Sequence, residues 1–389
     1  MKFIYLILLS CVLYSSELDS MQEEMQKMRD EFAQMKQTNK DEFQEYQESL
    51  NKEYETYKKE LQKYWDTPKL STKKEWISYS KDKKSRSDVD FEKNILIVET
   101  IAPNEQQAKK QLQKRLSYAV GKNTKEVVDT DTLQQRISKL PKTPFVFTAK
   151  VDAKPILSTV IFKKPPTKKV IENYAKKVIK KSKIEIKKSK VKHQKIYKIK
   201  IALPKNTTIK RSKIYKNDVF KNAERFNIPK HLVFAIIQTE SNFNPFAKSH
   251  IPAFGLMQIV PTSAGKDVYR FLYKKKGMPS VTYLYNGKNN IKMGTTYLHI
   301  LYYRYLKRIK NPQSRLYCSI AAYNTGAGNI AWAFTKSYSM KKAAPIINAL
   351  TPDEVYAHLL SDLRFDEPKN YLKRVNKRMA AFKKAYNLH

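Results

Sequence analysis

The segment that most constrains the fold is a short apolar stretch, His231 to Glu240, which reads HLVFAIIQTE. As a helix it is apolar on almost every face, so it must be buried, and its terminal carboxyl meets little water. Burial disfavours the ionised form, raises the carboxyl pKa and makes Glu240 a candidate proton donor near neutral pH. On spacing alone, a structural glutamate that caps or pairs at a helix end is the competing interpretation.

Four short motifs stand in order from Glu240 onward, and no other acidic residue occurs between Glu240 and Gly265. The motifs are Glu240-Ser241, Gly255 to Gln258 as GLMQ, Ala322 to Asn324 with Gly326 as AYNxG, and Phe365 to Tyr371 as FDEPKNY. In this order and spacing they resemble the family 1 lytic transglycosylases, which cleave peptidoglycan and have a goose-lysozyme-like fold. The last motif departs from the family's ETR-x-Y pattern, because Pro368 and Lys369 replace Thr and Arg.

The resemblance implies a reaction carried by one carboxylic acid. Glu240 would protonate the leaving oxygen and then act as base, while the N-acetyl group of N-acetylmuramic acid assists departure and the sugar's 6-hydroxyl closes a 1,6-anhydro ring. Most glycosidases need a second carboxyl, and none lies near Glu240 in sequence. Acids that could approach it in space are Asp267, Asp353, Asp362 and Glu367. A hydrolytic muramidase and a non-catalytic peptidoglycan-binding scaffold are therefore the alternatives.

The resemblance also implies which side chains surround the acid and the sugar. Ser249 would donate a hydrogen bond in the acid or acetamido site, with a turn serine as the alternative. Tyr323 would hold Glu240 through its phenol, and Gly255 would let the backbone approach the sugar. The other substrate-binding candidates are Gln258, which can hydrogen-bond hydroxyl or acetamide groups, Met257, which suits a core equally well, and Asn324, Glu367 and Tyr371.

Upstream of these motifs, residues 65–204 predict a mixed α/β domain. The segment from Trp76 to Ile101 is similar to the amino-terminal domain of a membrane-bound subfamily, the lytic murein transglycosylases C. Strand patterns occupy 95–101, 145–151 and 197–203, and helical patterns occupy 104–120 and 170–181.

From residue 205 to 389 the pattern is helical almost throughout. A long helix is expected over Asn290 to Ile309, and Thr351 to Glu354 reads as a capping box. We therefore predict an α+β fold, in which the mixed amino-terminal domain is followed by a mostly α, lysozyme-like transglycosylase (SLT) domain.

The formal net charge of +40, from 76 Lys and Arg against 36 Asp and Glu, implies an anionic partner. Between Lys163 and Lys213 there are 20 basic residues and 2 acidic ones. The lysines suit the solvated faces of helices and strands, and even so they attract anions. A nucleic-acid-binding protein is one class that fits this charge. It requires an intracellular location, which the amino terminus opposes, so we expect peptidoglycan strands as partner and no nucleic acid.

The amino terminus resembles a bacterial lipoprotein signal. Residues 1–10 contain a short apolar run, and Leu8-Leu9-Ser10 precedes Cys11, which would become the lipid-modified amino terminus. Val12 rather than an aspartate follows, which favours the periplasmic face of the outer membrane. Residues 11–64 predict a helical spacer, because apolar positions recur in steps of three and four.

Little else in the sequence suggests further chemistry. Cys318 lies in an apolar run and suits a small buried hydrophobe. The six histidines lack zinc-type spacing, and with 8 glycines the chain has no phosphate-binding glycine loop. We therefore expect no metal and no cofactor.

Overall fold

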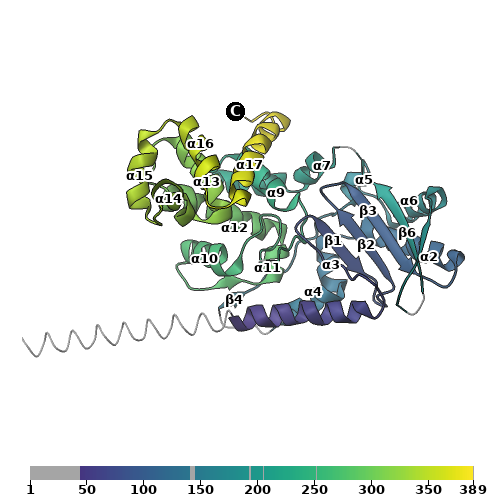
Figure 1. Ribbon diagram of the computed structural model, residues 1–389. Coiled ribbons are helices and arrows are strands. Elements are labelled where there is room, and N and C mark those ends of the chain that lie inside the picture. The colour runs from purple at the N-terminus through teal and green to yellow at the C-terminus, as the bar shows by residue number, and fades with distance from the viewer. Residues whose placement is uncertain (1–43, 141–144, 192–193, 205, 251, 389) are drawn as a thin grey trace, which may run out of the picture. The chain divides into compact units, whose positions relative to one another are not determined.

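The computed structural model describes residues 44–140, 145–191, 194–204, 206–250 and 252–388 (Figure 1). The chain divides into two compact units, Met1–Glu53 and Tyr54–His389. Residues 44–53 of the first unit are helical, and the second unit begins with helical residues 54–62. Cys11, the signal at 1–10 and most of the predicted spacer lie outside the described residues. Over the described ranges, no helix has the length and apolar content needed to cross a membrane.

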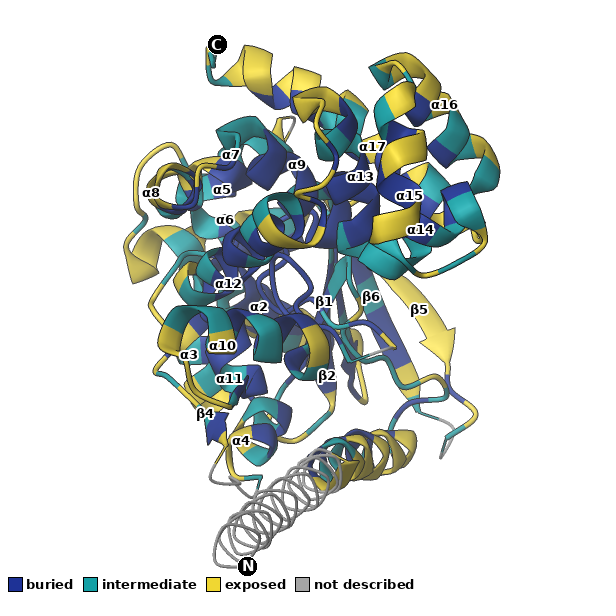
Figure 2. Cartoon of the chain, turned by 90° about the vertical axis from the view of Figure 1, so that its left-hand side faces the viewer, coloured by how far each residue is buried: buried dark blue, intermediate teal, exposed yellow. Residues whose placement is uncertain are grey.

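A five-stranded antiparallel sheet organises the first part of the second unit. In spatial order its strands are β1 (Glu75–Tyr79), β2 (Ser85–Asp90), β3 (Ile95–Ile101), β6 (Lys195–Ala202) and β5 (Glu185–Lys188). Leu96 and Val98 of β3 are fully buried, and Val98 pairs with buried Ile199 across the sheet, as the two-residue period of a strand requires. Strand β5 is exposed along its whole length (Figure 2), and its lysines suit an edge open to water.

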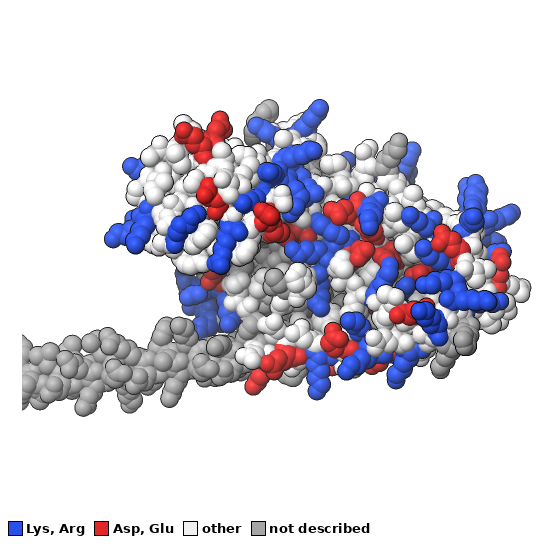
Figure 3. All heavy atoms as spheres, in the orientation of Figure 1, with Lys and Arg blue, Asp and Glu red and all other residues white. Residues whose placement is uncertain are grey.

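Several short and medium helices lie in the same described part of the chain as the sheet. They are α2 (Glu105–Gly121), α3 (Thr124–Thr130), α4 (Thr132–Ser138), α5 (Ser158–Ile161) and α6 (Lys168–Lys181). Helix α2 packs on β2 and β3, and α6 packs on α2. Asn104 caps α2 by accepting a hydrogen bond from the Gln107 amide, which satisfies one of the amide groups left free at a helix start. Most lysines of α6 point to solvent, and Lys and Arg crowd this end of the face drawn in Figure 3.

The rest of the second unit is helical. Its helices are α7 (Thr207–Ile214), α8 (Lys216–Arg225), α9 (Lys230–Ser241), α10 (Lys266–Tyr273), α11 (Val281–Tyr285), α12 (Gly287–Ile300), α13 (Pro312–Thr325), α14 (Ala327–Thr335), α15 (Met340–Ala349), α16 (Pro352–Asp362) and α17 (Asp366–Ala385), with π-helical turns η1 (Pro261–Gly265) and η2 (Leu301–Tyr305). Helix α9 is buried over most of its length, as its apolar faces predict, and α17 packs along it. In Figure 1, α9 lies between the sheet and the helices α12 to α17.

The α+β prediction is confirmed, and so are several of its elements. Strand β3 has the predicted bounds, α2 and α6 match their predicted helices within two residues, and the capping box at Thr351 forms. The helix expected over Asn290 to Ile309 instead ends at Ile300 and continues as η2, where the Leu306 amide donates to the Leu301 carbonyl five residues back.

The segment 145–151 differs more from its prediction. Only β4 (Val146–Phe147) is a strand, and it pairs in parallel with β7 (Met278–Pro279) from the helical part of the chain. The predicted boundary between residues 204 and 205 falls inside one compact unit, so the two predicted domains share contacts on both sides of it.

Candidate active site

Glu240 lies in the last turn of α9, and its side chain is 8% exposed. Burial raises the pKa of this carboxyl, because a charged carboxylate loses its hydration inside the protein. Lys73 opposes the rise, since its ammonium nitrogen is 3.9 Å from Glu240 Oε2. The net effect is a carboxyl pKa above the ordinary value, which suits a general acid.

The backbone beyond Glu240 turns sharply back under the helix. Asn242 and Phe243 both have positive φ, at 53° and 65°, and asparagine tolerates this conformation better than most residues. The Ser241 hydroxyl donates to the Leu256 carbonyl at 2.7 Å. This bond connects the end of α9 to the GLMQ loop. Glu240 therefore lies at the candidate site, and Ser241 holds the loop beside it.

Two tyrosines lie near Glu240, the half-buried Tyr323 on α13 and the buried Tyr371 on α17. The Tyr371 hydroxyl has no hydrogen-bond partner of normal geometry among the described residues, yet it lies close enough to Glu240 to lower the carboxyl pKa. Tyr323 donates to the Met257 carbonyl at 2.9 Å instead of to Glu240, which differs from the expected tether. A phenol can donate one hydrogen bond, and here the backbone carbonyl accepts it. Burial and the nearby Glu240 charge raise the pKa of both phenols.

Gly255 is required by protein packing as well as by any approach to a sugar. Its φ is +76°, and a Cβ built on it would lie 2.3 Å from Asn290 Nδ2 and 2.4 Å from the Leu284 carbonyl. Asn290 donates to the carbonyls of Phe254 and Leu284 and accepts from the Met257 amide at 2.7 Å. Sequence reasoning missed Asn290, because a single asparagine inside a helical pattern carries no sign that it holds a distant loop.

The other two motif residues divide between core and site. Met257 is fully buried, and a Cβ on Gly294 would meet its sulfur at 2.3 Å, so its side chain packs in the core. Gln258 donates from Nε2 to the carbonyls of Ala247 and Gly255 at 3.1 and 3.0 Å. Its Oε1 is buried and has no hydrogen-bond partner among the described residues.

The remaining candidates differ in exposure, from the buried Ser249 to the exposed Glu367. Ser249 makes a turn, since its amide donates to the Ala253 carbonyl and its hydroxyl accepts from the Ala253 amide. Asn324 is half-buried at the end of α13. Glu367 is exposed and lies 3.8 Å from Arg374, yet its charge still raises the pKa of Glu240. Lys369, which replaces the family's arginine, pairs with Asp366 at 3.8 Å.

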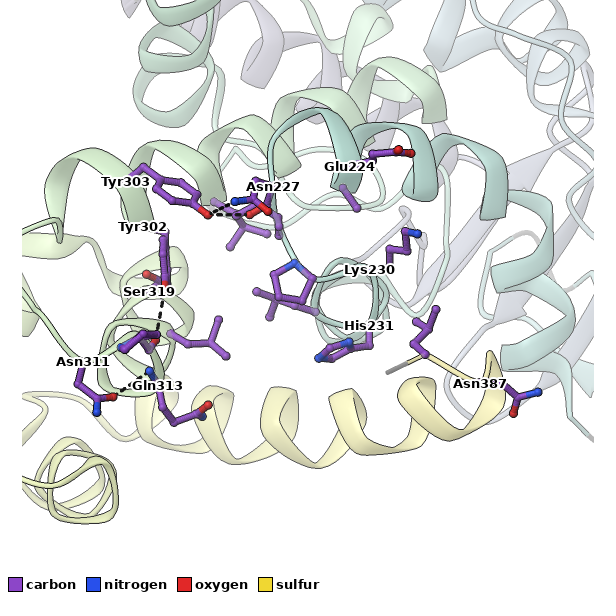
Figure 4. Close-up of a pocket in the computed structure, with 18 residues that line it drawn as sticks. Glu224, Asn227, Lys230, His231, Tyr302, Tyr303, Asn311, Gln313, Ser319 and Asn387 are labelled. Atoms are coloured by element: carbon purple, nitrogen blue, oxygen red, sulfur yellow. Dashed lines mark hydrogen bonds between the residues drawn. The ribbon is translucent and has the colours of Figure 1, made fainter.

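A cavity of about 1020 Å³ lies elsewhere on α9 (Figure 4). Glu224, Asn227, Lys230, His231, Tyr302 and Tyr303 are among the residues that line it, and Glu240 is not. Glu240 is ten residues beyond Lys230, or about 15 Å along the helix. Because its one acidic residue is Glu224, which is exposed, this cavity lacks the buried acid that marks the site at Glu240. No group of three His, Cys, Asp or Glu side chains gathers as a metal site in the described part of the chain.

Cys318 is a buried free thiol, as its apolar surroundings predicted, and burial raises the pKa of that thiol. It lies on α13 among fully buried neighbours such as Ile320 and Ala321. A thiol held in the neutral form is a poor nucleophile, so the cysteine contributes packing rather than chemistry.

Two protein-family models match the chain. The model of the transglycosylase SLT domain matches residues 218–346. The model of the N-terminal domain of membrane-bound lytic murein transglycosylase C matches residues 43–214. Membrane-bound lytic murein transglycosylase C of Sodalis glossinidius is 42% identical over 183 residues, which are 47% of this chain and 50% of that protein. The protein of the same name from Pectobacterium atrosepticum is 45% identical over 158 residues, 41% of this chain and 43% of that protein.

The chain therefore aligns with about half the length of the curated relatives it matches. Among solved structures, the 70 kDa soluble lytic transglycosylase from Escherichia coli aligns with 72% of this chain and 43% of its own, at 20% identity and a TM-score of 0.33.

Proposed function

A chain that carries an SLT domain behind a murein transglycosylase C amino-terminal domain belongs to the lytic transglycosylases, and from that premise we propose that it cleaves peptidoglycan without water. The bond is the β-1,4 link between N-acetylmuramic acid and N-acetylglucosamine. The product carries a 1,6-anhydro-N-acetylmuramic acid end. The observation that carries this proposal is the buried Glu240 carboxyl, whose raised pKa keeps a proton available.

One carboxyl can complete this reaction because the substrate supplies both nucleophiles. Glu240 gives its proton to the departing oxygen of the broken bond, while the N-acetyl group bonds to C1. The sugar's 6-hydroxyl then attacks C1, the acetyl oxygen leaves, and the hydroxyl proton passes to the Glu240 carboxylate. The acid is regenerated and no water is consumed. The unpaired Tyr371 hydroxyl supports this cycle, because it can donate to the carboxylate during the half-cycle in which the proton is absent.

The other site residues support substrate binding. Gln258 would hydrogen-bond the glycan through its side-chain amide. Glu367 is exposed and Asn324 is half-buried. Ser249 retains its hydroxyl proton for the same purpose, because in its turn the oxygen only accepts. Gly255 and Met257 pack the GLMQ loop against the protein, and the Met257 carbonyl accepts the hydrogen bond of the Tyr323 hydroxyl.

Hydrolysis is the second candidate, and Glu367 is the acid that could support it. Its charge acts on Glu240, as a second catalytic carboxylate's would, but it is 57% exposed. Asp267 and Asp362 have other partners, Arg270 and Tyr305 for the first and Lys336 and His358 for the second. These contacts support a single-acid mechanism over a two-carboxyl one.

Mass spectrometry of products from purified peptidoglycan tests the reaction. Anhydro-muropeptides are one water lighter than reducing products, and we expect them from the wild-type enzyme. Glu240→Gln should lower turnover at least about a hundredfold while the fold survives. Glu367→Gln is the matched control and should lower turnover much less. Reducing products from the wild type, together with equal losses in both variants, would identify a hydrolase with two carboxyls.

We propose further that the chain is held at the periplasmic face of the outer membrane by a lipid on Cys11. The support is the sequence around Cys11 and the relatives' description as membrane-bound. One acyl chain binds a membrane weakly and reversibly, whereas two or more anchor a protein stably. The lysine-rich surface then faces an anionic peptidoglycan layer, and no nucleic acid is expected as partner.

A further inference from the structure

The acid at the end of α9 is faced by a cation that comes from the amino-terminal part of the chain. Lys73 precedes β1, and its ammonium nitrogen lies 3.9 Å from Glu240 Oε2. The Glu240 side chain is 8% exposed and that of Lys73 is 40% exposed. The pair therefore spans the boundary between the buried carboxyl and solvent, beyond hydrogen-bond distance but well within electrostatic range.

The backbone on both sides of Lys73 is fixed to the loop that follows α9, the helix that carries the acid. The Thr72 carbonyl accepts from the Lys248 amide at 3.3 Å, and Asn244 Nδ2 donates to the Glu75 carbonyl at 3.2 Å. Trp76 packs its ring against Phe246, with centroids 5.7 Å apart. The backbone at Lys73 therefore has a defined position beside the end of α9.

Lys74 follows Lys73 directly but binds the backbone of α9 instead of the Glu240 carboxyl. Its ammonium donates to the carbonyls of Gln238 and Thr239 at 3.1 and 2.7 Å, which caps the end of α9 where the helix dipole favours a cation. The charged and titratable groups around Glu240 are thus Lys73 and Lys74 before β1, Tyr323 on α13, and Tyr371 and Glu367 on α17. Arg378 on α17 donates to the Thr239 hydroxyl and also acts on Lys74. Among Lys73, Lys74 and Arg378, Lys73 is the residue that forms an ion pair with Glu240.

Resting on the proposed function, we infer that Lys73 is an electrostatic positioning residue for proton transfer, supplied to the acid by the amino-terminal part of the chain. Before transfer the carboxyl is neutral and Lys73 interacts with it weakly. As the proton moves to the departing oxygen, the carboxylate forms beside the ammonium and is stabilised. An interaction that strengthens only as charge develops lowers the barrier.

The inference predicts a pH signature. Activity needs protonated Glu240 and falls as pH rises through the carboxyl pKa. A cation within about 4–6 Å lowers a carboxyl pKa by about 1–3 units, and the half-exposed Lys73 belongs at the lower end of that range. Replacing Lys73 by methionine should therefore move the alkaline limb of kcat/KM upward by about one pH unit.

The test compares Lys73→Met and Lys73→Arg in the full chain, with Lys81→Met as the control for loss of an exposed lysine from the same part of the chain. The substrate is a soluble, peptide-free glycan, and kcat and KM are measured across pH. We expect Lys73→Met to shift the limb, to lower kcat about threefold to tenfold at neutral pH, and to leave KM within about twofold. Lys73→Arg should restore both, and Lys81→Met should match the wild type.

An unshifted limb in Lys73→Met would overturn the inference, and so would a rise in KM alone, which would make Lys73 a substrate contact. Product analysis of the wild type separates this failure from a failure of the proposed function. Anhydro products with an unshifted limb reject the role of Lys73 alone, whereas reducing products reject the reaction itself. Thermal unfolding of each variant by circular dichroism confirms that the fold is present.

Discussion

Gly255 offers the sharpest test of why a glycine stands in the GLMQ loop. In Gly255→Ala the new methyl group would lie 2.3 Å from Asn290 Nδ2 and 2.4 Å from the Leu284 carbonyl. A positive φ costs an alanine about 1–2 kcal/mol. Displacing Asn290 removes three hydrogen bonds, two to the loop and one to Leu284 of α11, at about 1 kcal/mol each. The sum predicts a loss of about 4–5 kcal/mol in the free energy of unfolding.

Gly326 supplies a matched control, because its φ is +87° and a Cβ there would meet nothing within 4 Å. Gly326→Ala should therefore cost backbone strain alone, about 1–3 kcal/mol. Urea denaturation followed by far-UV circular dichroism measures both. Equal losses in the two variants would refute the packing argument. A Gly255→Ala variant of wild-type stability with a raised KM would instead favour the earlier interpretation, in which the glycine makes room for the sugar.

Three further predictions concern charge and anchoring. Burial lowers the pKa of Lys74 to about 7, so between pH 7 and the unfolded value near 10.5 the unfolded chain binds more protons and stability should rise with pH. Relative to Lys74→Met, the free energy of unfolding of the wild type should increase by about 1 kcal/mol per pH unit from pH 7 to 9 in urea titrations. A difference that does not change with pH would show that the two carbonyls keep the ammonium charged. Cys11→Ala should abolish labelling by a fatty-acid probe and membrane partitioning while activity on soluble fragments persists; unchanged partitioning without label would contradict a lipid anchor. Binding to intact sacculi should weaken as salt shortens the Debye length from about 10 Å at 0.1 M to about 3 Å at 1 M. Reversing the charge of several exposed lysines between Lys163 and Lys213 should weaken binding in the same way and leave turnover of peptide-free glycan nearly unchanged. A variant that binds sacculi normally but loses affinity for nucleic acid would reject peptidoglycan as the partner of these lysines.

Local periodicity accounts for what the sequence could predict. Strand β3 alternates half-buried and buried positions over most of its length, so its bounds follow from a two-residue pattern. The burial of α9 follows from its apolar faces, and with it the raised pKa of Glu240. The lysine-rich segment is mostly exposed as expected, although Arg211 is buried and donates to the Phe91 carbonyl.

Contacts between distant segments account for what it could not. Asn290 and Lys73 each act on residues far away in the chain, and nothing in their own neighbourhoods marks them. The motif resemblance predicted that Tyr323 holds Glu240 through its phenol, whereas in the structure the Tyr323 hydroxyl donates its hydrogen bond to the Met257 carbonyl. The π-helical turn η2 was missed for a related reason, since a three-and-four spacing does not reveal one added residue in a turn.

The short strand β4 limits how this chain could be recombined with others. Val146 pairs with Met278, and Phe147 stacks on Tyr269 with ring centroids 4.3 Å apart, so a piece of the first half completes the second. A chimaera joined between residues 204 and 205, with a foreign amino-terminal half, would lack both the strand and the aromatic ring. Transplantable modules are usually joined by exposed linkers that few contacts cross. Here the two halves are interlaced, and a working exchange would have to carry residues 145–151 with the catalytic half.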